Sequence, residues 1–146
     1  MISEALSAQI LSSMRDFLAL CPLIPDSSAI TLSSENNTSS LCMSVLPNPK
    51  LHSVIRKYLD GVEIFSFSFA LVINREVRKG NDDIIQTLSL LDNIALWTVS
   101  NKPDNLPENL KFISIAKNGF SFTDFSDIHR ASFTADFLLT LAFIPN

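Results

Sequence analysis

Two segments that lie far apart in the chain alternate apolar side chains with other side chains at a period of two. This period is typical of a strand that buries one of its two faces. The first segment lies between residues 62 and 74 and the second closes the chain. Their apolar positions are Phe65, Phe67, Phe69, Leu71 and Ile73, and then Phe133, Ala135, Phe137, Leu139, Leu141 and Phe143. We therefore expect a β-sheet with one buried, aromatic face.

Two dipeptides between apolar runs predict the turns of this sheet, Asp60-Gly61 and Asn118-Gly119. Both favour a tight two-residue hairpin, because Asp, Asn and Gly tolerate the positive φ that such a turn requires. The first turn would join 51–59 to 62–74, and the second would join 110–117 to 120–125. A two-residue turn at Asn118-Gly119 would place Ile115 opposite Phe122 and Lys117 opposite Phe120.

Helical periodicity predicts one helix before this sheet and one between its two hairpins. The first, Ser3 to Leu20, repeats apolar residues along one stripe and ends at Pro22 and Pro25. The second begins at Asn81-Asp82-Asp83 and fades near Ser100, with a buried face made of Ile84, Leu88, Leu91 and Ala95. Short strands are expected at 29–32 and 41–46, the latter stopped by Pro47-Asn48-Pro49. The polar run Ser33–Ser40 between them reads as a flexible loop.

These elements predict a single α+β domain that spans residues 1–146. The simplest arrangement is a mostly antiparallel sheet with two long hairpins and two helices packed on one face. A chain of 146 residues has the size of one domain. No stretch reaches the roughly 18–20 apolar residues of a membrane span, and the N-terminus lacks a signal peptide. We therefore expect a protein of the cytoplasm, without a membrane partner.

The composition contains little charge and much apolar surface. Hydrophobic residues make up 47% of the chain and charged residues 18%, against about 25% charged residues in a typical domain. Either a large core or partner subunits would account for this excess of apolar surface. The net charge of −4 argues against broad electrostatic binding to nucleic acid. Cys21 and Cys42 lack the CxxC spacing of metal and redox sites and are expected to be buried thiols.

Sequence motifs of enzymes are missing. The three glycines, Gly61, Gly80 and Gly119, cannot form a phosphate-binding loop. His52 and His129 are isolated, and Asp82-Asp83 is explained by its place at a helix start. We expect no enzyme activity, no catalytic or metal-binding residues and no cofactor. Contacts between subunits are instead expected in the Leu41–Tyr58 region and the Arg75–Lys79 connection, with Arg56, Tyr58, Arg75, Arg78 and Lys79 as candidates.

Six short motifs occur in an order that resembles one protein family, the tail terminator or minor capsid proteins of long-tailed phages of Gram-positive bacteria. The motifs cover most of the chain, and each is structural. They are Phe17-Leu18 with Cys21-Pro22-Leu23, Tyr58-Leu59-Asp60-Gly61, Trp97, Leu106-Pro107, Gly119-Phe120-Ser121-Phe122, and Ala131-Ser132-Phe133. The chain departs from the family pattern at Phe133, where a Tyr is expected, and at Ser33–Ser40, which has no counterpart.

The resemblance implies a structural virion protein. Copies of such a protein form a ring, commonly a hexamer, on the head-proximal end of the tail tube. The ring stops polymerisation of the tube and joins it to the head connector. Its partners would be itself, the tail tube protein and a head-completion protein, with DNA passing through the ring without specific binding. The virion neck would be its location after assembly in the host cytoplasm. The alternative is a monomeric or dimeric protein-binding module of a bacterium or prophage.

Overall fold

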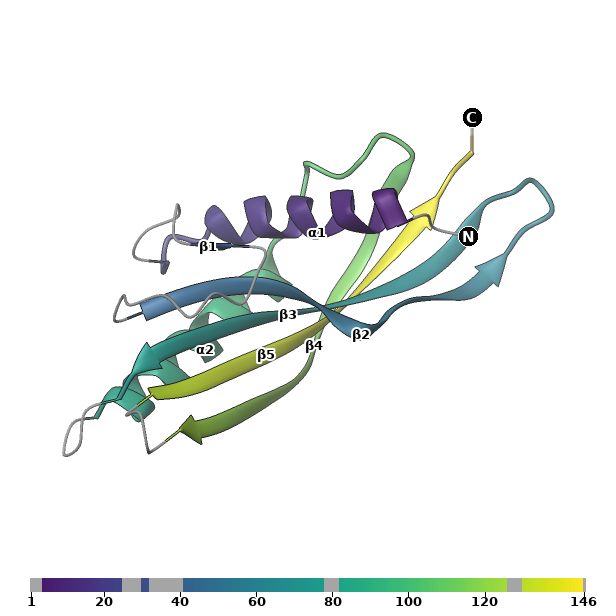
Figure 1. The fold of residues 1–146 in the computed structure, drawn as a ribbon. Helices are drawn as coiled ribbons and strands as arrows, with labels where there is room; N and C mark the ends of the chain where they lie inside the picture. Colours follow the sequence, from purple (N-terminus) through teal and green to yellow (C-terminus); the bar gives the residue numbers. More distant parts are fainter. Residues whose placement is uncertain (1–3, 25–29, 32–40, 78–81, 126–129, 146) are drawn as a thin grey trace.

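A computed structural model describes residues 4–24, 30–31, 41–77, 82–125 and 130–145. Its elements follow the order α1 (Glu4–Ala19), β1 (Ile30–Thr31), β2 (Leu41–Lys57), β3 (Glu63–Glu76), α2 (Asp83–Ser100), β4 (Leu110–Phe125) and β5 (Arg130–Phe143). The strands form one sheet in the order β1-β2-β3-β5-β4. All described pairs are antiparallel except the short β1–β2 pair. The predicted α+β fold with a mostly antiparallel sheet is confirmed, and so is the hairpin β2–β3 (Figure 1). The second long antiparallel pair is β4–β5, not the predicted pair 110–117 and 120–125.

The core lies between one face of the sheet and the two helices. Strands β3 and β5 pair along their full lengths, so their alternating apolar residues stand opposite one another, as Phe69 does to Phe137. The rings of these two residues stack with centroids 5.3 Å apart. Ile10, Met14 and Phe17 of α1 and Leu91, Ile94 and Ala95 of α2 belong to the same buried cluster. Each fully buried aromatic side chain contributes about 1.5–3 kcal/mol to stability, so this cluster is the main stabilising feature of the fold.

The β2–β3 hairpin turns where the sequence predicts, but its loop is longer than two residues. Gly61 N–H donates to the Tyr58 carbonyl at 3.1 Å, and Tyr58 N–H donates to the Val62 carbonyl at 2.9 Å. Gly61 has φ +91°, the left-handed conformation that closes a three-residue loop after a type I turn. The Asp60 carboxylate also accepts a hydrogen bond from Val62 N–H at 3.2 Å. The loop is therefore Leu59–Gly61, closed by Tyr58 and Val62.

The predicted turn at Asn118-Gly119 is wrong. Strand β4 continues through both residues, and all of its pairing is with β5, so Ile115 lies opposite Leu139 and Phe120 opposite Ala135. The register shifts between Lys117 and Phe120, and Gly119 has φ +117°. Asn-Gly therefore forms a β-bulge here, a second structure that uses the positive φ of glycine. Residues 126–129, which join β4 to β5 in the sequence, lie outside the described residues.

Strand β2 also differs from its prediction, because it runs through Pro47 and Pro49 where a stop is expected. Beyond Ser44 no described strand pairs with its outer side. Proline is tolerated on an edge strand because the missing N–H then faces away from the sheet. The pairing with β3 shifts register between Pro47 and His52, which places the irregularity at the prolines. The predicted loop Ser33–Ser40 lies outside the described residues.

Helix α2 begins and ends as predicted, but its buried face is rotated. Leu91 and Ala95 are buried as predicted, whereas Leu88 is 39% exposed. Thr87 and Thr98 are buried instead. Each of their hydroxyls donates a hydrogen bond to the carbonyl four residues earlier, at 2.7 Å. Because this bond satisfies the hydroxyl within the helix, threonine can occupy an interior position that apolar periodicity assigns to leucine.

Candidate functional site: a hairpin tip and two sheet edges

The described residues contain no cluster of His, Cys, Asp and Glu that could hold a metal ion. The hydrophobic core is accompanied by a few buried polar side chains, namely Ser7, Ser13, Ser44, Asp83, Thr87 and Thr98. Burial raises the pKa of the Cys21 thiol, which keeps the thiol protonated and weakly nucleophilic. The side chains of Cys42, His52 and His129 lie outside the described part of the chain. The polar side chains buried among the described residues thus accompany the packing of the core.

Arg75, one of the predicted subunit contacts, binds within its own chain. Its guanidinium donates to Thr87 Oγ1 at 2.9 Å and forms an ion pair with Asp83 Oδ1 at 3.4 Å. Asp83 lies in the first turn of α2, where a carboxylate also suits the positive end of the helix. This contact fastens the start of α2 to the end of β3. The contact could not be predicted from sequence spacing, because its partners lie 8 and 12 residues away from Arg75.

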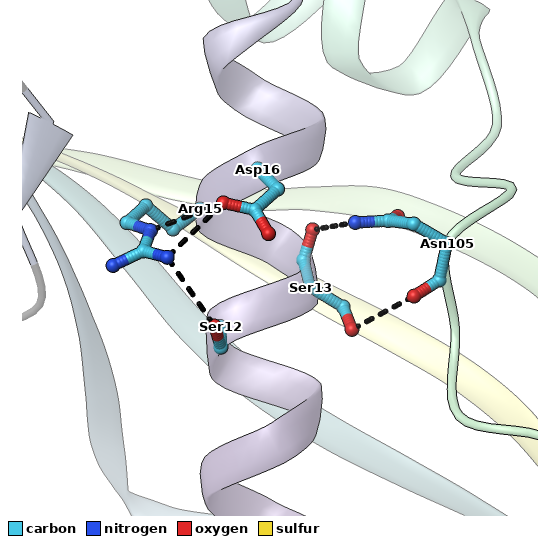
Figure 2. A network of polar contacts seen from close by, with 5 residues as sticks. All are labelled: Ser12, Ser13, Arg15, Asp16 and Asn105. Carbon is cyan, nitrogen blue, oxygen red and sulfur yellow. Dashed lines mark hydrogen bonds and ion pairs between the residues drawn. The ribbon is translucent and has the colours of Figure 1, made fainter. Parts of the chain in front are cut away.

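A second polar contact joins α1 to the connection that follows α2 (Figure 2). Ser13 Oγ donates to the Asn105 carbonyl at 3.0 Å, and Asn105 Nδ2 donates to the Ser13 carbonyl at 3.1 Å. On the other flank of α1, Arg15 binds Asp16 and Ser12. The reciprocal Ser13–Asn105 pair positions the segment that leads into β4, and it links residues 92 apart in sequence.

The tip of the β2–β3 hairpin exposes apolar side chains that no described element covers. Leu59 is fully exposed, and Ile55 and Tyr58 are exposed beside it. Arg56 donates to the Tyr58 hydroxyl at 3.4 Å, and Lys57 forms an ion pair with Glu63 at 3.5 Å across the hairpin. The structure thus brings together the predicted contacts Arg56 and Tyr58. In Figure 1 this hairpin extends past the helices at one end of the molecule.

Strand β4 forms one edge of the sheet and carries exposed apolar side chains of its own. A register shift between Phe112 and Ser114 leaves Ile113 without a partner on β5. A bulge of this kind redirects the side chain of the extra residue, and Ile113 is 46% exposed. Phe120 and Phe122, further along β4, are exposed to a similar degree. The predicted turn at Asn118-Gly119 would have paired Phe120 with Lys117 and Phe122 with Ile115, whereas these two phenylalanines lie opposite Ala135 and Phe133 of β5.

An open groove lies where the end of α2 meets β4. It has a volume of about 410 Å³ and is lined by apolar and polar residues alike, namely Val99, Phe112, Ile113 and Ile115, and Ser100, Asn101, Lys102 and Ser114. This volume lies at the lower end of the range of ligand pockets. The groove borders β4, whereas the hairpin tip belongs to the β2 side of the sheet.

The sheet face opposite the core consists largely of small and hydroxyl side chains. On β3, β5 and β4 they are Ser66, Ser68, Ala70, Ser132, Thr134, Thr140, Ala142, Ser114, Ala116, Ser121 and Thr123, accompanied by the apolar residues Ile64, Val72 and Leu138 and by the charged residues Glu76, Arg130, Asp136 and Lys111. The core cluster places both helices on the other face. This face therefore offers hydroxyl groups and little positive charge.

Arg78 and Lys79, the remaining predicted contacts, lie outside the described residues. No helix in the described part of the chain is both long and apolar enough to span a bilayer. The chain matches no model of a known protein family and no curated protein.

Proposed function

We propose that this chain is a structural protein whose copies join head to tail into a closed ring, and that the ring acts as the terminator of a phage tail tube. The observation that carries the proposal is the pair of strand edges on opposite sides of one sheet. β4 has no described neighbour on its outer side, and the outer side of β2 has none beyond Ser44. Two different surfaces that fit each other generate a ring when the rotation between subunits closes.

Both edges carry features that prevent indiscriminate pairing. β4 contains two bulges and the exposed residues Lys111 and Lys117, and β2 contains Pro47 and Pro49. Bulges, lysine and proline are the usual protection of sheet edges against aggregation. An edge protected in this way accepts a partner only when side chains fix the geometry. A terminator needs this property, because its assembly must stop at one layer.

The sheet face opposite the core supports the proposed role as a tail-tube terminator, through which DNA must pass. If this face lines the channel of the ring, DNA meets Ser and Thr hydroxyls, the carboxylates of Glu76 and Asp136 and the cations of Lys111 and Arg130, which are not clustered. Tight binding to the phosphate backbone needs clustered Lys and Arg, so such a channel lets the polymer pass. The tail tube protein and a head-completion protein would bind the two rims of the ring.

The test is to polymerise the tail tube protein of the same genome in the presence of this chain. Tubes should stop growing and carry a ring of this protein at one end in electron micrographs. A chain that leaves tube length unchanged and binds no tube end would contradict the terminator role. A 1:1 complex of this chain with an unrelated bacterial protein would instead support the alternative, a protein-binding module.

A further inference from the structure

We propose that the tip of the β2–β3 hairpin of one copy inserts into the groove between α2 and β4 of the next copy. This inference rests on the head-to-tail assembly proposed above and names its contact. Leu59 is the inserted side chain, and Val99, Ile113 and Ile115 form the apolar wall that receives it. The two surfaces lie on opposite sides of the same sheet, as a head-to-tail contact requires.

The shape of the tip favours insertion. Leu59 occupies the first position of a three-residue loop and is fully exposed. The loop is fixed by the hydrogen bonds of Tyr58, Gly61 and Asp60, so binding costs little ordering entropy. A rigid loop that presents a leucine to solvent gains free energy when that side chain enters an apolar site.

The groove exists because of the bulge in β4. In a regular strand, Ile113 would take the face opposite that of Phe112 and Ser114. The extra residue in the strand instead leaves Ile113 without a partner on β5, in the lining of the groove. Ile115 and Val99 also line it, where the end of α2 meets the strand. Ile113, exposed beside these two residues, gives Leu59 an apolar contact within a groove whose lining is otherwise half polar.

The charges at the two surfaces are complementary. Asp60 follows Leu59 at the tip and is exposed, and Lys102 lies in the lining of the groove. With Leu59 inserted, the neighbouring carboxylate approaches the ammonium group at the rim. Opposite charges at the rim of an interface fix its orientation and speed association, and they disfavour the reverse docking. A second copy of this chain is therefore the occupant that the groove fits.

The contact is tested by disulfide trapping. The variant Leu59→Cys/Ile113→Cys is made with Cys42→Ser, which removes the thiol of β2, and the concentrated protein is treated with a mild oxidant. We expect a ladder of covalent multimers, because each chain carries both partners of the bond. The control pair Leu59→Cys/Leu20→Cys places its second thiol at a site that is 69% exposed and reports random collision, so it should yield severalfold fewer multimers. Trapping also detects a transient contact when most of the protein is monomeric.

A charge rescue completes the test. Lys102→Glu places a carboxylate against Asp60 and should reduce the multimer yield severalfold. Adding Asp60→Asn removes the repulsion while keeping an oxygen that accepts the Val62 N–H, and should restore the yield. If the protein forms rings but the 59–113 pair yields no more multimers than the control pair, the inserted tip is wrong while ring assembly stands. If neither rings nor multimers form, both proposals fail.

Discussion

Phe17 of α1 and Trp97 of α2 lie in contact, with ring centroids 5.1 Å apart and ring planes inclined by 31°. The two helices therefore touch each other as well as the sheet. α1 packs on β1 and β2, and α2 packs on β5 and β4, so this aromatic pair closes the layer over the middle of the sheet. With the core covered in this way, the exposed apolar side chains at the hairpin tip and along β4 stand outside the helical layer.

The two glycines of positive φ should differ in their tolerance of a side chain. An added Cβ at Gly61 would lie 2.9 Å from Cγ of Pro145, whereas one at Gly119 meets no atom within 4 Å. Both substitutions to Ala should destabilise by about 1 kcal/mol, because alanine disfavours positive φ. Gly61→Ala should lower the free energy of unfolding by more than Gly119→Ala does, and combining Gly61→Ala with Pro145→Ala should remove this difference. Urea unfolding of Gly61→Ala, Gly119→Ala, Pro145→Ala and Gly61→Ala/Pro145→Ala measures these costs. Equal costs of the two glycine substitutions alone would contradict the proximity of the tip to the C-terminal segment.

The Arg75–Asp83 pair should contribute to stability through the start of α2. Arg75→Met leaves a carboxylate that is only 3% exposed without its guanidinium partner. We expect a loss of about 1–3 kcal/mol, because a buried charge that loses its partner is costly. Arg75→Met/Asp83→Asn should cost less than the sum of the single changes. Chemical unfolding of the four proteins tests this, and strict additivity would show that the two residues do not interact.

The reciprocal Ser13–Asn105 contact should hold the connection before β4 in place. Ser13→Ala removes one of the two bonds and Asn105→Ala removes the other side-chain donor. Each change should cost about 0.5–1.5 kcal/mol and should increase amide hydrogen exchange in residues 101–109. Ser12→Ala, on the other flank of α1, is the matched control and should leave exchange there unchanged. Faster exchange confined to α1 would contradict a role in positioning this connection.

Cys21 should make stability depend on pH in the alkaline range. Burial raises the pKa of this thiol above its ordinary value of 9.0. The folded state then holds the proton more tightly than the unfolded state. Its stabilising contribution is complete below pH 9 and is lost as the pH rises through the higher folded pKa. Cys21→Ser should flatten the stability profile above pH 9. An unchanged slope in thermal unfolding scans between pH 8 and 10.5 would contradict the effect of burial.

The strands that bury one face were predictable from sequence, since Phe65 to Ile73 and Phe133 to Leu141 show their period directly. The helices were predictable for the same reason. The structure at Asn118-Gly119 was not predictable, because Asn-Gly suits a hairpin turn and a β-bulge equally. Only the pairing of β4 with β5 decides between the two. Pro47 and Pro49 were ambiguous in the same way, because proline occurs both where a strand ends and within an edge strand.

The candidate surfaces were only partly predictable. Arg56 and Tyr58 could be named because they adjoin a recognisable turn. The groove could not be predicted, because it forms where a bulge at Ile113 lies beside the end of α2. Neither the bulge nor this proximity leaves a local pattern in the sequence. Arg75 illustrates the opposite error. From sequence alone, a charged residue at the end of an apolar strand is expected to face solvent. Arg75 instead binds Asp83 and Thr87 of α2, which lies beside the end of β3.

Ring formation is tested most directly by the mass of the native protein at high concentration, combined with electron microscopy of the same sample. We expect a closed oligomer of uniform copy number that appears as a ring with a central channel; the family resemblance suggests six subunits. The mass of a single chain at every concentration, with micrographs that show only small solid particles, would contradict the account.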